Sequence, residues 1–418
     1  MSIIVKAKYK KGLFAKKISI ENFMETLGKI NVEKEYKAEL IRYSNNQFVM
    51  SLLPGGSIQF NVTETLMEIS SQTSLVGPGF HKCVIDIIEE LGTRMGLHFD
   101  ITDPTDYDGT RAFMMLQKEH INDVREIFAE IVKSREEKPV EGSNFVGWRN
   151  NWFPLRQKEI ITSYGSFTVE EIKEKLASED FDEFAKSMIY WFDETKTAQY
   201  YKQTALFYLW NGYRWRKPVT KEDARVSQLI LHSLEMARMA DNDITLPSQA
   251  WQQICAYTGV PYLNLNEAAD LDDSKIGYLK YPVHFHLPLD YGLKLPGSFE
   301  MGRDKEGFIV LADPNRTIKI KIAPEMQPGH VMDPRKMLEQ IDYQEERNGS
   351  IYVAQITDAK VSGGSIYILH GYIQSYASYA EVNIVLRNVE DKEWALNALK
   401  AIEVPFTRPI SLASLDQQ

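Results

Sequence analysis

The sequence predicts an α+β protein made of three parts. Residues 1–140 carry strand patterns followed by helix patterns, residues 150–262 are mainly helical, and residues 278–410 return to strands. Two charged segments, 136–147 and 264–277, are candidate linkers between these parts. Hydrophobic residues make up 44% of the 418 residues, which is enough to form the cores of two or three domains.

Alternating apolar residues predict an antiparallel sheet in the first part. This pattern covers residues 34–44, 47–53 and 57–62, which are separated by Asn-Asn and Pro-Gly-Gly turns. A short further strand is expected at 97–101. Apolar residues at helical spacing, preceded by capping residues, predict helices against one face of this sheet: 20–30, 78–91 and 115–135.

The middle part carries the start and stop signals of several helices. Thr168 and Glu171 are spaced as a capping box, in which each side chain bonds the backbone N–H of the other residue. Thr220 and Ser248 are further helix starts, and Gly259 is a helix stop. About four or five helices joined by short turns are therefore expected in this helical region.

The last part combines long strand patterns with two helices. Asp313–Arg316 is expected to form a hairpin turn, residues 334–341 a helix, and residues 392–402 a closing helix. The predicted strands are 281–289, 307–313, 317–323, 350–357, 364–373 and 380–389.

The order of these elements is a strand pair, a helix, long antiparallel strands and a closing helix. Residues 280–404 thereby resemble the Mog1/PsbP-like α/β/α sandwich, and the resemblance includes DYGLKLPGSFEM, DPNRTIKIKIAP and YAEVNIVLRNVEDKEWALNALKAI. It implies a C-terminal sandwich-like domain that acts as a binding or assembly module, as in bacterial immunity and accessory proteins. No functional residue carries over, because the resemblance is one of element order.

Charge and cysteine content restrict the function and the compartment. The net charge of −10 disfavours general binding to nucleic acid or anionic membranes, and the lysines between Lys6 and Lys17 are expected on an exposed strand edge. Cys83 and Cys255 cannot form a disulfide framework. Because no signal-peptide or membrane-helix pattern is present, the sequence predicts a soluble, cytoplasmic protein.

The Gly77–His81 turn has two interpretations. Pro78 at the first helical position is typical of a helix start, which accounts for the motif structurally. The N–H groups of Gly79, Phe80 and His81 would also suit a phosphate or carboxylate at the positive end of the helix dipole. We expect the structural role, in which His81 lies on the flank of the apolar stripe of the predicted helix. Gly79, Phe80 and His81 stay a candidate site for an anion.

The Asp103–Asp108 loop is similar to a calcium loop. Pro104, however, occupies the first ligand position, and Met115 the position of the bidentate glutamate. The loop is therefore more typical of a turn and a helix start. Together with His81, its aspartates are the candidate catalytic groups if the protein is an enzyme.

His284 and His286 alternate on one predicted strand and would place two imidazoles on the same side, as half of a zinc site. A third ligand is required, and His330 and His370 are candidates in the same part. Since the spacing of known metal motifs is missing, neither a metal nor another cofactor is predicted.

Two aromatic stretches have the most distinctive local composition. Tryptophan, tyrosine and arginine dominate binding hot spots, but they also pack helices and bond helix ends. Packing is the more common role. The candidate interaction surface consists of Trp148, Trp152, Trp210, Tyr213, Arg214, Trp215 and Arg216.

The sequence lacks the signatures of metalloproteases, serine hydrolases, thiol redox proteins and kinases. The expected function is a non-enzymatic protein-binding module, of the immunity or accessory type that neutralises a partner toxin. The acidic balance suits a basic protein partner. The alternatives are an enzyme on an unrecognised scaffold, hydrolytic or nucleotide-processing, and a structural component of a phage or secretion apparatus.

Overall fold

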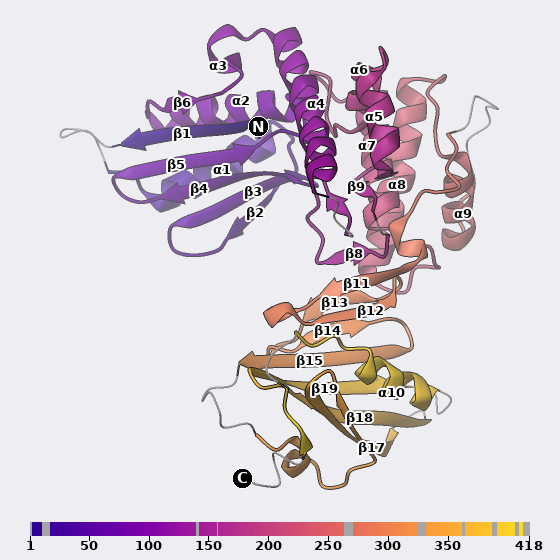
Figure 1. Cartoon of the computed structure of the whole chain (residues 1–418). Helices are drawn as coiled ribbons and strands as arrows, with labels where there is room; N and C mark the ends of the chain where they lie inside the picture. The colour runs from indigo at the N-terminus through magenta and orange to yellow at the C-terminus, as the bar shows by residue number, and fades with distance from the viewer. Residues whose placement is uncertain are drawn as a thin grey trace. The chain divides into compact units, whose positions relative to one another are not determined.

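The computed structural model divides into two compact units (Figure 1). The first comprises Met1–Arg149, Arg156–Gly212 and Arg225–Ile276, and the second Asn150–Leu155, Tyr213–Ala224 and Gly277–Gln418. The structure describes residues 2–10, 17–138, 142–156, 158–262, 271–324, 332–361, 364–386, 391–405 and 409–412. No helix within these ranges combines the length and the apolar composition that crossing a membrane requires.

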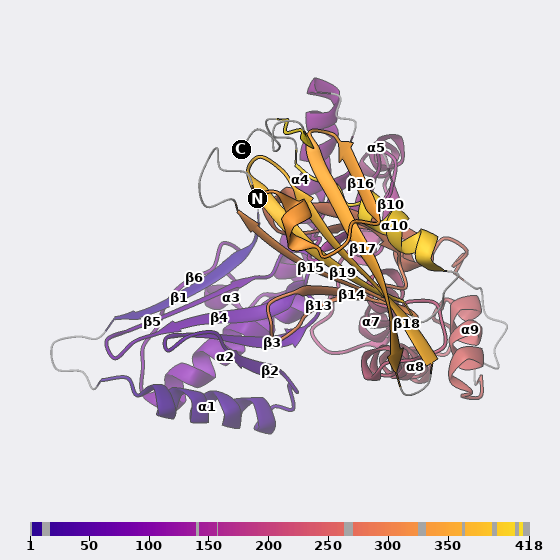
Figure 2. The same ribbon diagram turned by 90° about the horizontal axis from the view of Figure 1, so that it is seen from below.

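An antiparallel sheet with two helices on one face forms the start of the first unit (Figures 1 and 2). Its elements are β1 Ile4–Lys10, α1 Ile20–Glu33, β2 Glu39–Arg42, β3 Gln47–Leu53, β4 Gly56–Val62, β5 Leu66–Gln72, α2 Pro78–Met95 and β6 Asp100–Thr102. The strand order is β2-β3-β4-β5-β1-β6. Phe23 of α1 packs against Phe48 and Phe60 of the sheet, and Val84 of α2 joins the same core.

A second core joins the long helix after this sheet to the helices that follow. The remaining elements of the first unit, up to residue 258, are α3 Tyr107–Thr110, α4 Phe113–Glu137, β7 Asn144–Phe145, β9 Ile160–Thr162, β10 Gly165–Phe167, α5 Val169–Ala177, α6 Phe181–Ser187, α7 Ala198–Asn211, α8 Lys221–Ala240 and α9 Ser248–Thr258. The first residues of α8, up to Ala224, belong to the second unit. Val124 and Phe128 of α4 share a core with Ile172 and Phe184. Because this core crosses the boundary predicted near residue 140, the α+β part and most of the helical part form one unit, where the sequence predicted two domains.

Most of the predicted helix-end signals are present, although Ser248 is the first residue of α9 and not its cap. The Thr168 side chain accepts the N–H of Glu171 at 3.1 Å, and the Glu171 carboxylate accepts the N–H of Thr168 at 2.7 Å. Ser19 caps α1 by accepting the N–H of Asn22, and Gly259 ends α9 in the left-handed conformation. These local signals therefore place helix ends correctly, even where the domain boundary differs.

Two sheets form most of the second unit. Their strands are β8 Trp152–Pro154, β11 Pro282–His286, β12 Gly292–Pro296, β13 Glu300–Arg303, β14 Ile309–Ala312, β15 Arg316–Pro324, β16 Tyr343–Arg347, β17 Ser350–Val361, β18 Gly364–Gln374 and β19 Ser378–Leu386. The orders are β12-β11-β8 and β13-β14-β15-β19-β18-β17-β16. Asp313 accepts the N–H of Arg316 at 2.8 Å, which confirms the predicted hairpin turn between β14 and β15.

The seven-stranded sheet has different cover on its two faces. On one face lies α10, Lys392–Lys400, whose Leu399 packs against β18 (Figure 1). On the other face, Val353 packs with Leu338. The helix predicted over 334–341 is only the 3-10 turn Pro334–Met337, because Leu338 becomes extended and joins this apolar cluster. The predicted α+β class is confirmed.

Candidate functional site

The histidine near the start of α2 is buried and bonded within the chain. His81 exposes none of its surface, and its Nε2 lies 3.1 Å from Oδ2 of Asp103. Its Nδ1 lies 3.0 Å from the hydroxyl of Thr73. Both ring nitrogens are therefore engaged inside the first unit. Since no substrate reaches the ring in this conformation, the enzyme alternative loses the histidine on which it relied.

Asp103 organises the loop that follows β6. Its carboxylate accepts the backbone N–H groups of Thr105 and Asp108 at 2.9 and 3.0 Å. Burial alone would raise the pKa of Asp103, but the contact with His81 and the Thr105 donors lower it well below the usual 3.8. The loop is thus a turn held by one buried carboxylate. Among the residues described, no group of three or more His, Cys, Asp or Glu side chains could hold a metal ion.

The start of α2 is covered, so it does not present an open anion site. The N–H of Gly79 donates to the carbonyl oxygen of Trp191 at 3.0 Å, and the N–H of His81 donates to that of Gly77 at 3.0 Å. A Cβ atom on Gly79 would lie 2.3 Å from Nε1 of Trp191. The candidate site of Gly79, Phe80 and His81 is therefore closed, because the chain around Trp191 packs directly on the helix end.

His284 and His286 lie on the same side of β11 but have different surroundings. Nε2 of His284 is 3.0 Å from a carboxylate oxygen of Glu403, whereas His286 is exposed. Of the two further histidines considered, His370 is bonded to an asparagine of β19 at 2.6 Å, and His330 falls outside the described residues. The described part of the chain does not gather these side chains into a metal site.

The predicted aromatic and basic surface is buried at three of its seven positions and half-buried at the other four. Trp152, Trp210 and Tyr213 are only 7%, 7% and 3% exposed, so they do not form a contact surface. Trp148 and Trp210 belong to the first unit, whereas Trp152 and residues 213–216 belong to the second. The burial of these three rings contradicts the surface prediction at their positions.

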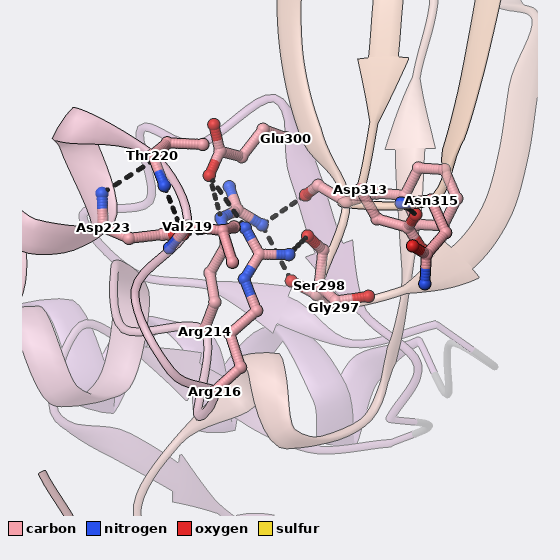
Figure 3. Close-up of polar contacts among 11 residues, drawn as sticks. Arg214, Arg216, Val219, Thr220, Asp223, Gly297, Ser298, Glu300, Asp313 and Asn315 are labelled. Atoms are coloured by element: carbon pink, nitrogen blue, oxygen red, sulfur yellow. Dashed lines mark hydrogen bonds and ion pairs between the residues drawn. The ribbon is translucent and has the colours of Figure 1, made fainter. Parts of the chain in front are cut away.

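Arg214 and Arg216 fasten a loop of the second unit (Figure 3). Nη1 of Arg214 donates to the carbonyl oxygen of Gly297 at 2.7 Å, and Nη1 of Arg216 donates to that of Ser298 at 2.7 Å. The Glu300 carboxylate lies 3.3 Å from Nε of Arg214 and 3.2 Å from Nη2 of Arg216. Both guanidinium groups therefore serve to hold residues 297–300 in place.

A second carboxylate links the same arginine cluster to the start of α8 (Figure 3). Asp223 accepts Nη2 of Arg216 at 3.0 Å and the backbone N–H of Val219 at 3.1 Å. Burial opposes ionisation of Asp223, but the N–H and Arg216 lower its pKa. Burial raises the pKa of Glu300, although Arg214 acts in the opposite direction. The cluster is a structural clamp within the second unit.

The feature that sequence reasoning missed is the face of the six-stranded sheet opposite α1 and α2, which we call the sheet face. It is hollow, with a cavity of about 780 Å³. The strand register aligns one row of Val49, Gln59, Ser70, Lys6 and Thr102, and a neighbouring row of Gln47, Asn61, Glu68, Lys8 and Asp100. Alternation along the strands identifies these positions as outward-pointing, but it carries no information about the curvature that hollows the sheet.

Neither the known protein-family models nor the curated protein sequences include a match to this chain. The sheet face, the arginine clamp and the buried pair of His81 and Asp103 are therefore interpreted from their own geometry and chemistry.

Proposed function

We propose that this chain is a non-enzymatic protein-binding module of the accessory or immunity type, which binds its partner on the sheet face. The observation that carries the proposal is the hollow of about 780 Å³ in an exposed face built from six strands. Such a face offers many side chains on a frame that the hydrogen bonds between strands keep rigid. A partner protein can therefore make many contacts with a surface whose positions are fixed in advance.

The chemistry of the sheet face suits polar recognition. Gln59 is exposed, and its amide makes no hydrogen bond with the described residues, so it is available to a partner. Lys8 and Glu68 form an ion pair of 2.8 Å across β1 and β5. Tyr43 borders the hollow and is 67% exposed, and tyrosine is among the side chains that contribute most to interfaces.

The charge of the whole chain supports a basic partner. A net charge of −10 speeds the encounter with a positively charged protein and disfavours acidic competitors. The enzyme alternative depended on His81, which is fully buried. No particular observation favours a structural component of a phage or secretion apparatus, so the binding module is the proposal that we keep.

Site-specific photo-crosslinking in the native host tests this proposal. A photoreactive amino acid is placed at Gln59 on the sheet face, and in a control chain at Glu393, which is exposed on α10. We expect one discrete, basic protein to be crosslinked from position 59 and not from position 393. Adding Tyr43→Ala should weaken this crosslink. The same products from both positions, or none from position 59, would count against the proposal.

A further inference from the structure

A second cavity lies within the first unit and has a different character. Its volume is about 390 Å³, within the range of sites for small organic ligands. The turn between β3 and β4, helices α4 and α7, and residues 145–149 all contribute to its wall. Six aromatic residues line it: Phe128, Phe145, Trp148, Tyr164, Tyr190 and Phe207.

The aromatic residues of the cavity wall differ in exposure. Phe128 and Tyr190 are buried, at 0% and 3% exposed. Phe145 is 37% exposed, and its ring centre lies 5.7 Å from that of Trp148. These two rings therefore border the opening. A ligand with a flat or branched apolar body would meet aromatic surface on both the buried and the exposed part of the wall.

The cavity wall includes a cation that has no partner among the described residues. Arg149 lines the cavity, and its Nε is 3.9 Å from the position that a Cβ atom of Gly55 would take, so the side chain extends toward the β3–β4 turn. Arg149 makes no ion pair or hydrogen bond with the described residues, whereas Arg94 and Arg111 of the same unit are both paired with glutamates. Partial burial lowers the pKa of Arg149, and no acidic side chain offsets this effect.

The cavity wall also contains a polar group that lacks a partner in the described part of the chain. The hydroxyl of Tyr164 is buried and has no hydrogen-bond partner among the described residues. A buried hydroxyl without a partner is unfavourable, and most such groups in proteins are bonded to protein, water or ligand. The wall thus combines a large apolar area with unsatisfied hydrogen-bonding capacity.

We propose that this cavity binds a small amphipathic carboxylate, with its aromatic or apolar body among the six aromatic side chains and its carboxylate on Arg149. A guanidinium bonds a carboxylate through two parallel N–H groups, which gives both affinity and orientation. The inference does not depend on the proposed protein partner, because the cavity and the sheet face are separate surfaces of the first unit.

Calorimetric titration with two matched probes tests the inference. The probes are 2-naphthylacetate and the neutral 2-naphthylacetamide, which share one apolar body. We expect the carboxylate to bind the wild-type chain at least about tenfold more tightly than the amide. In Arg149→Gln this preference should fall to within about twofold. In the control Arg303→Gln, an exposed arginine of the second unit, it should be unchanged.

A cavity-filling variant shows where the probes bind. Ile131 of α4 lines the cavity, and Ile131→Trp should remove the binding of both probes while the far-ultraviolet circular dichroism is retained. Equal affinity for the two probes, no binding to the wild-type chain, or an unchanged preference in Arg149→Gln would each overturn the inference. Retained binding in a folded Ile131→Trp chain would place the probes elsewhere and would overturn it as well.

Discussion

Two buried ionisable side chains of α4 respond to pH in opposite directions. Burial lowers the pKa of His120 to about 3, and the nearby His81 acts in the same sense. The ring donates through Nδ1 to the carbonyl oxygen of Ser74 at 2.8 Å, and Nε2 has no partner among the described residues. Burial raises the pKa of Asp123 to about 6, against a smaller opposite effect of the Ser74 hydroxyl. As the pH falls below 6.5, the usual pKa of histidine, His120 therefore lowers the stability of the protein. As the pH falls from about 6 to 3.8, the folded and the usual pKa of the aspartate, Asp123 raises it.

Asp123→Asn should separate these two contributions. At pH 7.5 the wild-type carboxylate is charged and only 5% exposed, so the variant removes a buried charge. We expect Asp123→Asn to raise the free energy of unfolding by about 2–3 kcal/mol at pH 7.5 and by only about 1 kcal/mol at pH 4.5, where the folded wild-type side chain is protonated while the unfolded one is still largely ionised. Urea denaturation at the two pH values measures the difference.

The control for this comparison is Asp182→Asn, which removes a side chain that is 62% exposed and lies 3.6 Å from Arg125. Its effect should stay below about 1 kcal/mol. A stabilisation by Asp123→Asn that is equal at both pH values would contradict the assigned pKa shift.

The candidate site was only partly predictable at the level of residues. The position of His81 on the flank of a helical stripe could be read from its spacing, but Asp103 and Thr73 lie 22 and 8 residues away along the chain. Similarly, Trp191 reaches the start of α2 from more than 100 residues further on, and no local pattern records this contact. Hydrogen bonds between distant segments depend on the tertiary fold, which periodicity does not encode.

At the level of secondary-structure elements, the packing at the start of α2 makes a specific prediction. A Cβ atom on Gly79 would lie 2.3 Å from Nε1 of Trp191 and 2.4 Å from the carbonyl oxygen of Asp193. Gly79→Ala should therefore lower the free energy of unfolding by about 3 kcal/mol, since the backbone must shift to relieve the overlap. In the matched variant Gly28→Ala, the added methyl group in α1 meets nothing within 4 Å.

Gly28→Ala should raise the stability by about 0.5–1 kcal/mol through helix propensity alone. Urea denaturation of both variants measures the contrast. If the two substitutions had the same sign, the close contact between α2 and the chain around Trp191 would be refuted.

Helices and strands were the most predictable level of the structure. The capping box at Thr168 and the strands on either side of the Asp313 turn follow from local chemistry, and they are found where they were expected. The predicted helix at 334–341 fails for a tertiary reason. Its sequence is compatible with a helix, but Leu338 is extended and packs in the cluster with Val353, which removes apolar surface from water.

At the level of the whole molecule, the units are not continuous in sequence, and a linear reading of the chain does not find them. β8 is separated by more than 120 residues from β11, yet the two strands pair through Trp152 and Phe285. Residues 213–224, read from the sequence as part of a helical domain, belong to the second unit through the arginine clamp. Composition changes along a chain indicate domain boundaries only when each domain is one segment.

This organisation predicts that residues 277–418 do not fold alone, although the sequence marked a domain at 278–410. The fragment lacks β8, which leaves an edge of β11 unpaired, and it lacks Arg214 and Arg216, which leaves the half-buried Glu300 carboxylate without its two cations. We expect poor amide dispersion in its nuclear magnetic resonance spectrum and no cooperative thermal transition.

Adding a peptide of residues 213–224 should restore part of the dispersion, whereas the same peptide with both arginines replaced by methionine should not. A well-dispersed spectrum from the fragment alone would show that the clamp and β8 are dispensable for the fold of the second unit.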